Sequence, residues 1–108
     1  NARIKIKQRL SEKRLMITYL YNAIDLLKEA QGLLKEGDDN ETKFVINLYI
    51  AEAYFYLGKI NEANEYFSIS ESLLEEIINR VPKGEAREIF LKRKTYQEFN
   101  EFKSLIKK

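Results

Sequence analysis

The chain has 108 residues, 44% of them hydrophobic and 33% charged, and its single Pro and four Gly leave few places for turns. The lack of Cys excludes a disulfide framework and thiolate chemistry, and no run of about 18 uncharged apolar residues marks a transmembrane helix. No segment resembles a secretory signal, so we expect one cytoplasmic domain, 1–108, made of a few long elements around a single core.

The first third of the chain has the periodicity of a long helix. One apolar stripe recurs at steps of three, four and seven: Ile17, Leu20, Ile24, Leu27 and Leu34. We expect a helix over 3–36, or one that starts only at Ser11, where Ser followed by Glu can cap a helix. A loop over 37–40 follows it, and Asp38 and Glu41 have the spacing of a capping box, which predicts the start of a second helix near residue 40.

Two amphipathic helices, over 40–57 and 61–80, are expected to form a hairpin at the centre of the chain. Gly58 tolerates the positive φ that commonly ends a helix. Asn61 has a side-chain oxygen that can cap the second helix. Ala63 is small where two helix backbones must approach each other, which favours a tight pair.

This hairpin resembles a tetratricopeptide repeat. That pattern reads W-x-x-L-G-x-x-Y, then A-x-x-x-F, then Pro. The chain carries residues at these spacings: Asn47, Ile50, Ala51, Tyr54, Ala63 and Phe67. Asn47 replaces the large aromatic residue, and Pro82 comes too late for a repeat of standard length. The resemblance covers about one hairpin and implies that one side of its first helix lines a concave binding surface.

A last helix is expected over 84–107, because Pro82 cannot continue the helix before it. The cationic run Lys92-Arg93-Lys94 interrupts its apolar stripe. The spacing Tyr96-x-x-Phe99-x-x-Phe102-Lys103 resembles the third helix of microtubule-interacting and transport (MIT) domains, although the Arg of that pattern is missing. This second resemblance implies a three-helix bundle over about 44–108, with a groove beside the last helix for C-terminal tails of ESCRT-type membrane-remodelling proteins.

The sequence therefore predicts an all-α fold, an antiparallel array of about four helices with tetratricopeptide-like or MIT-like hairpins. It contains no His, which is the usual general base near neutral pH, and its four Gly are isolated, so no phosphate-binding loop is present. The acid pairs Asp38-Asp39 and Glu75-Glu76 lack the convergent partners of a metal site. We expect no enzyme activity, no metal and no cofactor, and a role as a protein-interaction adaptor.

The first helix of the hairpin carries more apolar residues than its packing face can use. The candidate partner-binding residues lie on the other side: Val45, Tyr49, Glu52, Phe55 and Tyr56. We expect them to form a groove for a peptide or helix of a protein partner, in which Tyr hydroxyls and Glu52 provide polar selection. The alternative is that the N-terminal helix or the last helix covers them.

Charge is unevenly distributed although the net charge is only +2. Residues 1–15 hold six Lys/Arg and one acid, residues 16–80 five and twelve, and residues 81–108 eight and four. The candidate basic surface consists of Lys5, Lys7, Arg9, Lys92, Arg93 and Lys94. This pattern predicts complementary contacts within the fold or a self-associated form, or else non-specific binding of nucleic acid or another acidic surface. The acidic middle argues against nucleic acid, because it would repel a long polyanion.

Both end helices carry more apolar residues than one packing face needs. In stacked helical arrays each unit buries its face only against a neighbour. We therefore expect a homo-oligomer, with a staggered or antiparallel dimer favoured by the basic ends and acidic middle, or packing against further parts of a longer chain.

Overall fold

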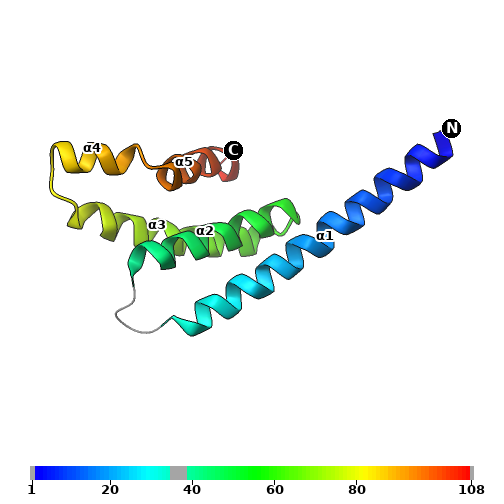
Figure 1. Cartoon of the computed structure of the whole chain (residues 1–108), viewed down its shortest axis with the longest axis horizontal. Coiled ribbons are helices and arrows are strands. Elements are labelled where there is room, and N and C mark those ends of the chain that lie inside the picture. The colour runs from blue at the N-terminus through cyan, green and yellow to red at the C-terminus, as the bar shows by residue number, and fades with distance from the viewer. Residues whose placement is uncertain (1, 35–38, 108) are drawn as a thin grey trace.

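The computed structural model describes the backbone of residues 2–34 and 39–107, and the side chains from residue 12 onward within those ranges. Five helices follow one another: α1 (Ala2–Leu33), α2 (Asn40–Tyr56), α3 (Ile60–Arg80), α4 (Glu85–Leu91) and α5 (Lys94–Ile106) (Figure 1). All regular structure in the described ranges is helical, which confirms the all-α prediction. None of these helices combines the length and apolar character that a membrane crossing requires.

Helices α2 and α3 form a hairpin around a short turn. Gly58 has φ +81° and ends α2 as predicted, while the N–H of Lys59 donates to the carbonyl of Tyr54 at 2.9 Å. The prediction that Asn61 caps the next helix is wrong. Helix α3 already begins at Ile60, because the backbone turn alone redirects the chain, and the residue before it makes no side-chain capping bond.

The start of α2 is capped by a side chain. The carboxylate of Asp39 accepts a hydrogen bond from the backbone N–H of Glu41 at 3.0 Å, which satisfies one of the free N–H groups of the first turn. The capping box expected on Asp38 lies outside the described residues. Asp39 therefore supplies the acceptor in the structure.

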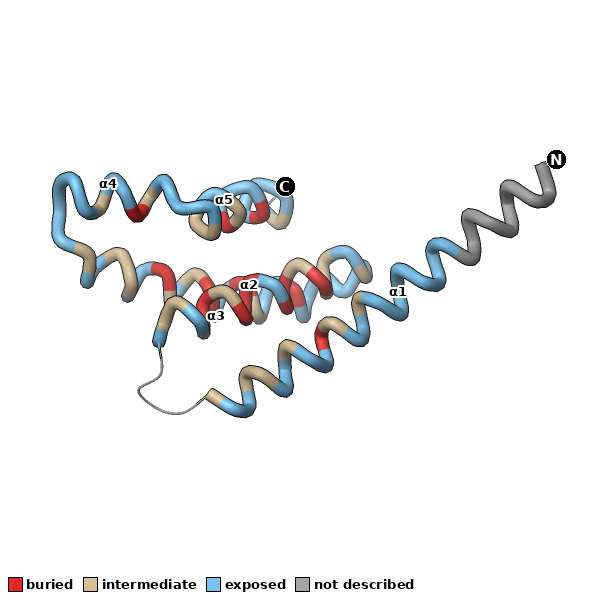
Figure 2. The backbone as a smooth tube through the Cα atoms, viewed as in Figure 1, coloured by how far each residue is buried: buried red, intermediate tan, exposed pale blue. Residues whose placement is uncertain are grey.

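The core lies where the hairpin meets the C-terminal helices. Its buried members come from four helices: Phe44, Leu48, Ala51, Phe67, Leu74, Phe90, Phe99 and Phe102 (Figure 2). Ala63 is fully buried in the α2–α3 contact, and Phe67 one turn later is also buried. The small residue lets the two helices approach, as the sequence predicted.

The expectation of one helix over 84–107 is wrong, because the chain forms α4 and α5 with a break at Lys92 and Arg93. Phe90 and Phe99 are nine residues apart, about two and a half helical turns, so a straight helix would place them on opposite sides. Arg93 instead adopts an extended backbone with ψ 146°, and both phenylalanines are buried. The cationic run that interrupts the apolar stripe is where the helix breaks.

Helix α1 packs on α2 through its second half. Among the described side chains of α1 only Ile24 is buried, and residues 12–19 are all exposed. The amide of Gln31 donates to Asn47 Oδ1 at 3.0 Å, and Asn47 Nδ2 donates to the carbonyl of Lys43 at 2.8 Å. The buried Asn47 is thereby satisfied, and its polar pair fixes where α1 docks. The helix starts at Ala2, not at Ser11, so its N-terminal half extends the molecule to 60 Å.

Replacing Ala63 with Leu adds three carbon atoms at a position that is fully buried between α2 and α3. Overpacking of this kind costs about 1–3 kcal/mol, and we expect the free energy of unfolding in urea to fall by that amount. Ala86→Leu, at an exposed position of α4, is the matched control and should change stability by less than about 0.5 kcal/mol. An Ala63→Leu variant as stable as the wild type would show that α2 and α3 do not meet closely there.

A second pair of substitutions tests the turn between α2 and α3. Gly58→Ala meets no neighbouring atom but must adopt φ +81°, so we expect a loss of about 1–2 kcal/mol. Gly32→Ala, inside α1, meets no neighbour and no positive φ, so higher helix propensity should stabilise the protein by up to about 1 kcal/mol. Thermal unfolding of both variants measures the two signs. Equal effects would contradict the conformational explanation.

Candidate functional site

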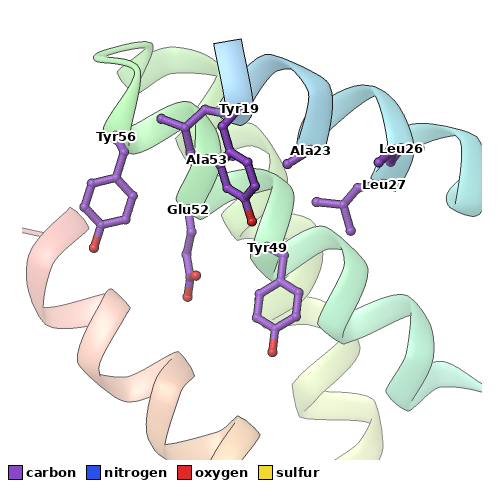
Figure 3. Close-up of a pocket in the computed structure, with 9 residues that line it drawn as sticks. Tyr19, Ala23, Leu26, Leu27, Tyr49, Glu52, Ala53 and Tyr56 are labelled. Carbon is purple, nitrogen blue, oxygen red and sulfur yellow. The ribbon is translucent and has the colours of Figure 1, made fainter. Parts of the chain in front are cut away.

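Three side chains of α2 project to one side of the helix, between α1 and α5. Tyr49, Glu52 and Tyr56 are spaced by three and four residues, which places them on one face over about 10 Å of helix. Figure 3 shows the two tyrosine rings with the Glu52 carboxylate between them, pointing into the space that the flanking helices leave. Tyr49 and Tyr56 are 37% and 63% exposed and Glu52 is half-buried, so the two flanking helices cover this face only in part.

The wall on one side is apolar and comes from α1. A cavity of about 470 Å³ lies beside the α1–α2 contact. It is lined by residues of both helices: Tyr19, Leu20, Ala23, Leu26, Leu27, Tyr49, Glu52, Ala53 and Tyr56. The α1 residues contribute only aliphatic and aromatic surface, apart from one tyrosine hydroxyl.

The wall on the other side is acidic and comes from α5. A second cavity, of about 320 Å³, is lined by Tyr49, Glu52, Tyr56, Glu98, Glu101, Phe102 and Leu105. Because the two cavities share the same three α2 residues, they form one groove, which we call the α1–α5 groove. Its floor is α2, and three carboxylates line it. Lys94 Nζ lies 4.0 Å from Glu98 Oε1, at the upper limit for an ion pair.

The electrostatics of the groove follow from the closeness of these carboxylates. Partial burial, together with the charge of Glu98, raises the pKa of Glu52 to about 7. The hydroxyl of Tyr49 donates to Glu98 Oε2 at 3.3 Å. Burial, the charge and hydrogen bond of Glu98 and the charge of Glu52 raise the pKa of Tyr49. Near neutral pH the groove therefore holds a carboxyl group that is only partly ionised.

The structure separates the five predicted partner-binding residues into two sets. Tyr49, Glu52 and Tyr56 line the groove. Val45 is half-buried and packs against the core at the other end of α2. Phe55 is also half-buried, with its ring 5.5 Å from Phe102 in an edge-on arrangement. Phe55 thus packs on α5, Val45 packs against the core, and neither lines the groove.

The predicted basic residues do not all behave as free cations. Arg93 pairs with Glu41 at 2.8 Å, and Lys94 lies near Glu98, whereas Lys92 is exposed. The other three, Lys5, Lys7 and Arg9, belong to α1, but their side chains lie outside the described residues. Acids therefore partly neutralise the cluster at residues 92–94, as expected if charges complement one another within the fold.

The walls of the groove include residues that the sequence did not single out as a site. On α1, Tyr19, Ala23 and Leu26 form a second stripe beside the one that packs on α2. On α5, Glu98, Glu101 and Leu105 repeat at three and seven residues. Both patterns are visible in the sequence, but only the packing of α1 and α5 beside α2 brings them together as the walls of one groove.

Within the described residues, no group of three or more His, Cys, Asp or Glu side chains is arranged to hold a metal ion. Comparisons of the chain with protein-family models, with curated proteins and with solved structures found no significant match. The resemblances to tetratricopeptide repeats and to MIT domains therefore stay predictions, and the function must be argued from the groove itself.

The raised pKa of Glu52 makes stability depend on pH. Between its ordinary value of 4.5 and about 7, the folded protein keeps a proton that the unfolded chain has released. The folded state binds more protons in this interval, so the free energy of unfolding falls as the pH rises through it. Glu52→Gln has no proton to lose and should lack this fall.

We expect the Glu52→Gln variant to match the wild type at the acidic end of this interval and to be more stable than the wild type above pH 7. Urea unfolding of both proteins at the two ends measures the difference. Parallel pH profiles would mean that the Glu52 carboxyl is solvated and does not sense the groove.

Proposed function

We propose that this protein is a non-catalytic interaction module that binds a helical segment of a partner protein in the α1–α5 groove. The observation that carries the proposal is the open position of Tyr49, Glu52 and Tyr56 between two flanking helices. The partner segment would present an apolar stripe flanked by Lys or Arg. The apolar surface, the charge and the backbone geometry of the groove each support one part of this description.

The exposed apolar and aromatic side chains of the groove are clustered and not scattered singly over the surface. Tyr19, Leu26 and Tyr56 are each more than 60% exposed and surround the same cavity. Aromatic side chains that can be buried by a partner typically supply most of the energy of a protein interface. An apolar stripe laid between α1 and α2 would remove these rings and aliphatic groups from water.

The charge of the groove selects a basic partner. Glu52 stands between the apolar wall and the acidic one, with Glu98 and Glu101 behind it. A lysine or arginine brought into the groove would favour the ionised form of Glu52, which is disfavoured in the free protein. An acidic segment would instead meet three carboxylates, so it is excluded by repulsion.

The backbone of the groove favours a helix as its occupant. All regular structure in the described residues is helical, so the groove offers no strand edge to which an extended peptide could add. An extended segment would enter with unpaired N–H and C=O groups, which is costly where water is excluded. A helix satisfies its own backbone and needs only side-chain complementarity.

Two synthetic amphipathic peptides of about 18 residues, or about five helical turns, test the proposal. Both carry the same leucine stripe, which is flanked by lysines in one peptide and by glutamates in the other. In an NMR titration, the lysine peptide should shift the backbone resonances of Tyr49, Glu52 and Tyr56, and the glutamate peptide should not. Binding of the lysine peptide should also strengthen from pH 5.5 to pH 8, as Glu52 ionises.

The double variant Tyr49→Ala/Tyr56→Ala should weaken binding of the lysine peptide by about tenfold or more, since it removes two aromatic contacts. Tyr21→Ala is the control, because Tyr21 is a partly exposed tyrosine of α1 that does not line the groove. If both peptides bind alike, or if the Tyr49→Ala/Tyr56→Ala protein binds as well as the wild type, the groove is not the binding site.

A further inference from the structure

The N-terminal half of α1 extends away from the rest of the molecule (Figure 1). Tyr19 and Tyr56, at the turn end of α2, line the same cavity, and residues 12–18 of α1, before Tyr19, are all exposed. From residue 2 to residue 19 the helix rises by about 26 Å. An isolated helix of this length is only marginally stable in water, so its persistence calls for a packing partner.

This segment carries apolar groups without a partner in the fold. Leu15 and Met16 are 69% and 64% exposed, and Ile17 continues, past the end of α2, the stripe that packs on that helix. The same segment is strongly basic, with six Lys/Arg and one acid among residues 1–15. It therefore has the two properties that the α1–α5 groove selects, namely apolar surface and positive charge.

The segment cannot reach the groove of its own chain. Residues 19–27 of α1 line that groove, and α1 is one continuous helix from Ala2 to Leu33. The N-terminal half therefore continues along the axis of the groove wall and leaves the groove behind. Only a second copy of the chain can place this segment in the groove.

We propose that the α1–α5 groove is occupied by the N-terminal half of α1 from a second copy, in a reciprocal two-fold dimer. This inference rests on the proposed function, because it names the basic amphipathic helix that the groove takes. The two α1 helices run antiparallel and cross near Met16. With the two-fold axis at residue 16, residues 5–13 of one copy lie alongside residues 19–27 of the other, which are those that line the groove.

The arrangement satisfies both copies at once. In a two-fold interface each surface is used twice, so both segments and both grooves are filled. The two hairpins lie at opposite ends of the paired α1 helices and do not compete for space, since each flanks only the second half of its own α1. The acidic side chains Glu52, Glu98 and Glu101 receive the basic segment of the other copy.

Charge exchange tests the proposal on the full chain. Lys13→Glu/Arg14→Glu reverses the charge of the segment at two exposed positions, and Glu98→Lys/Glu101→Lys reverses that of the groove. Sedimentation equilibrium should find a wild-type dimer, with each variant alone weakened by about tenfold or more, since symmetry counts every change twice. An equimolar mixture of the two variants should dimerise again, because the new acids of one variant's segment then face the new lysines of the other variant's groove.

A matched control is Lys83→Glu/Lys92→Glu, which makes the same change of charge at exposed positions outside both surfaces and should dimerise like the wild type. Because the mixture can associate only if both variants fold, its recovery separates lost complementarity from lost structure. A dimer that is indifferent to the segment and groove variants, or a mixture that stays monomeric, overturns the proposal.

Cross-linking tests the crossing point. The chain has no Cys, so Met16→Cys introduces a single thiol close to the proposed two-fold axis. Mild oxidation should join two copies at low protein concentration, whereas Leu33→Cys, an exposed position at the other end of α1, should not. Equal cross-linking of the two variants contradicts the antiparallel crossing.

A wild-type protein that stays monomeric at high concentration overturns occupation by a second copy. It does not overturn the proposed function, which the peptide titration tests separately, because a free groove would still bind the lysine peptide. Failure of that titration in a monomeric protein would overturn both proposals.

Discussion

The stacked rings of Phe67 and Phe99 hold α5 against the hairpin. Their centroids are 5.2 Å apart and their planes 10° from parallel, and Phe102 meets Phe67 edge-on at 5.8 Å. The ring centroid of Phe44, on α2, lies 5.6 Å from that of Phe99. This cluster joins α2, α3 and α5 in one core. Burial of these rings removes a large apolar surface from water, and the cluster therefore fixes the rotation of α5 against the hairpin.

That rotation decides the chemistry of the groove. With Phe99 and Phe102 turned into the core, Glu98, Glu101 and Leu105 fall on the neighbouring face of α5, beside α2. The same rotation brings Glu98 within hydrogen-bond distance of Tyr49 and close enough to Glu52 to disfavour its ionisation. A carboxyl group between two tyrosines thus acquires a pKa raised to about 7.

The other wall of the groove is held by a few polar contacts. Gln31 bonds to Asn47, and Lys28 Nζ donates to the hydroxyl of Tyr54 at 2.7 Å. Asn47 occupies the position where a tetratricopeptide pattern has a large aromatic residue, and it uses both ends of its amide. These contacts, with Ile24, set the position of α1. They all lie in the second half of that helix, and residues 12–19 before them are exposed.

The helical character of the chain and the turn at Gly58 could be predicted from local patterns, because helical periodicity and positive φ are local properties. The sequence also placed Tyr49, Glu52 and Tyr56 on one face of their helix, but it put Val45 and Phe55 there too, and the structure packs these two against the core. Tertiary structure decided the rest. In a straight helix Phe90 and Phe99 would point to opposite sides, yet both are buried in one core. The chain therefore breaks at Lys92 and Arg93. The walls of the groove and the pKa of Glu52 depend on α1 and α5, which are distant in sequence and brought together only by packing, and no local pattern encodes such distances.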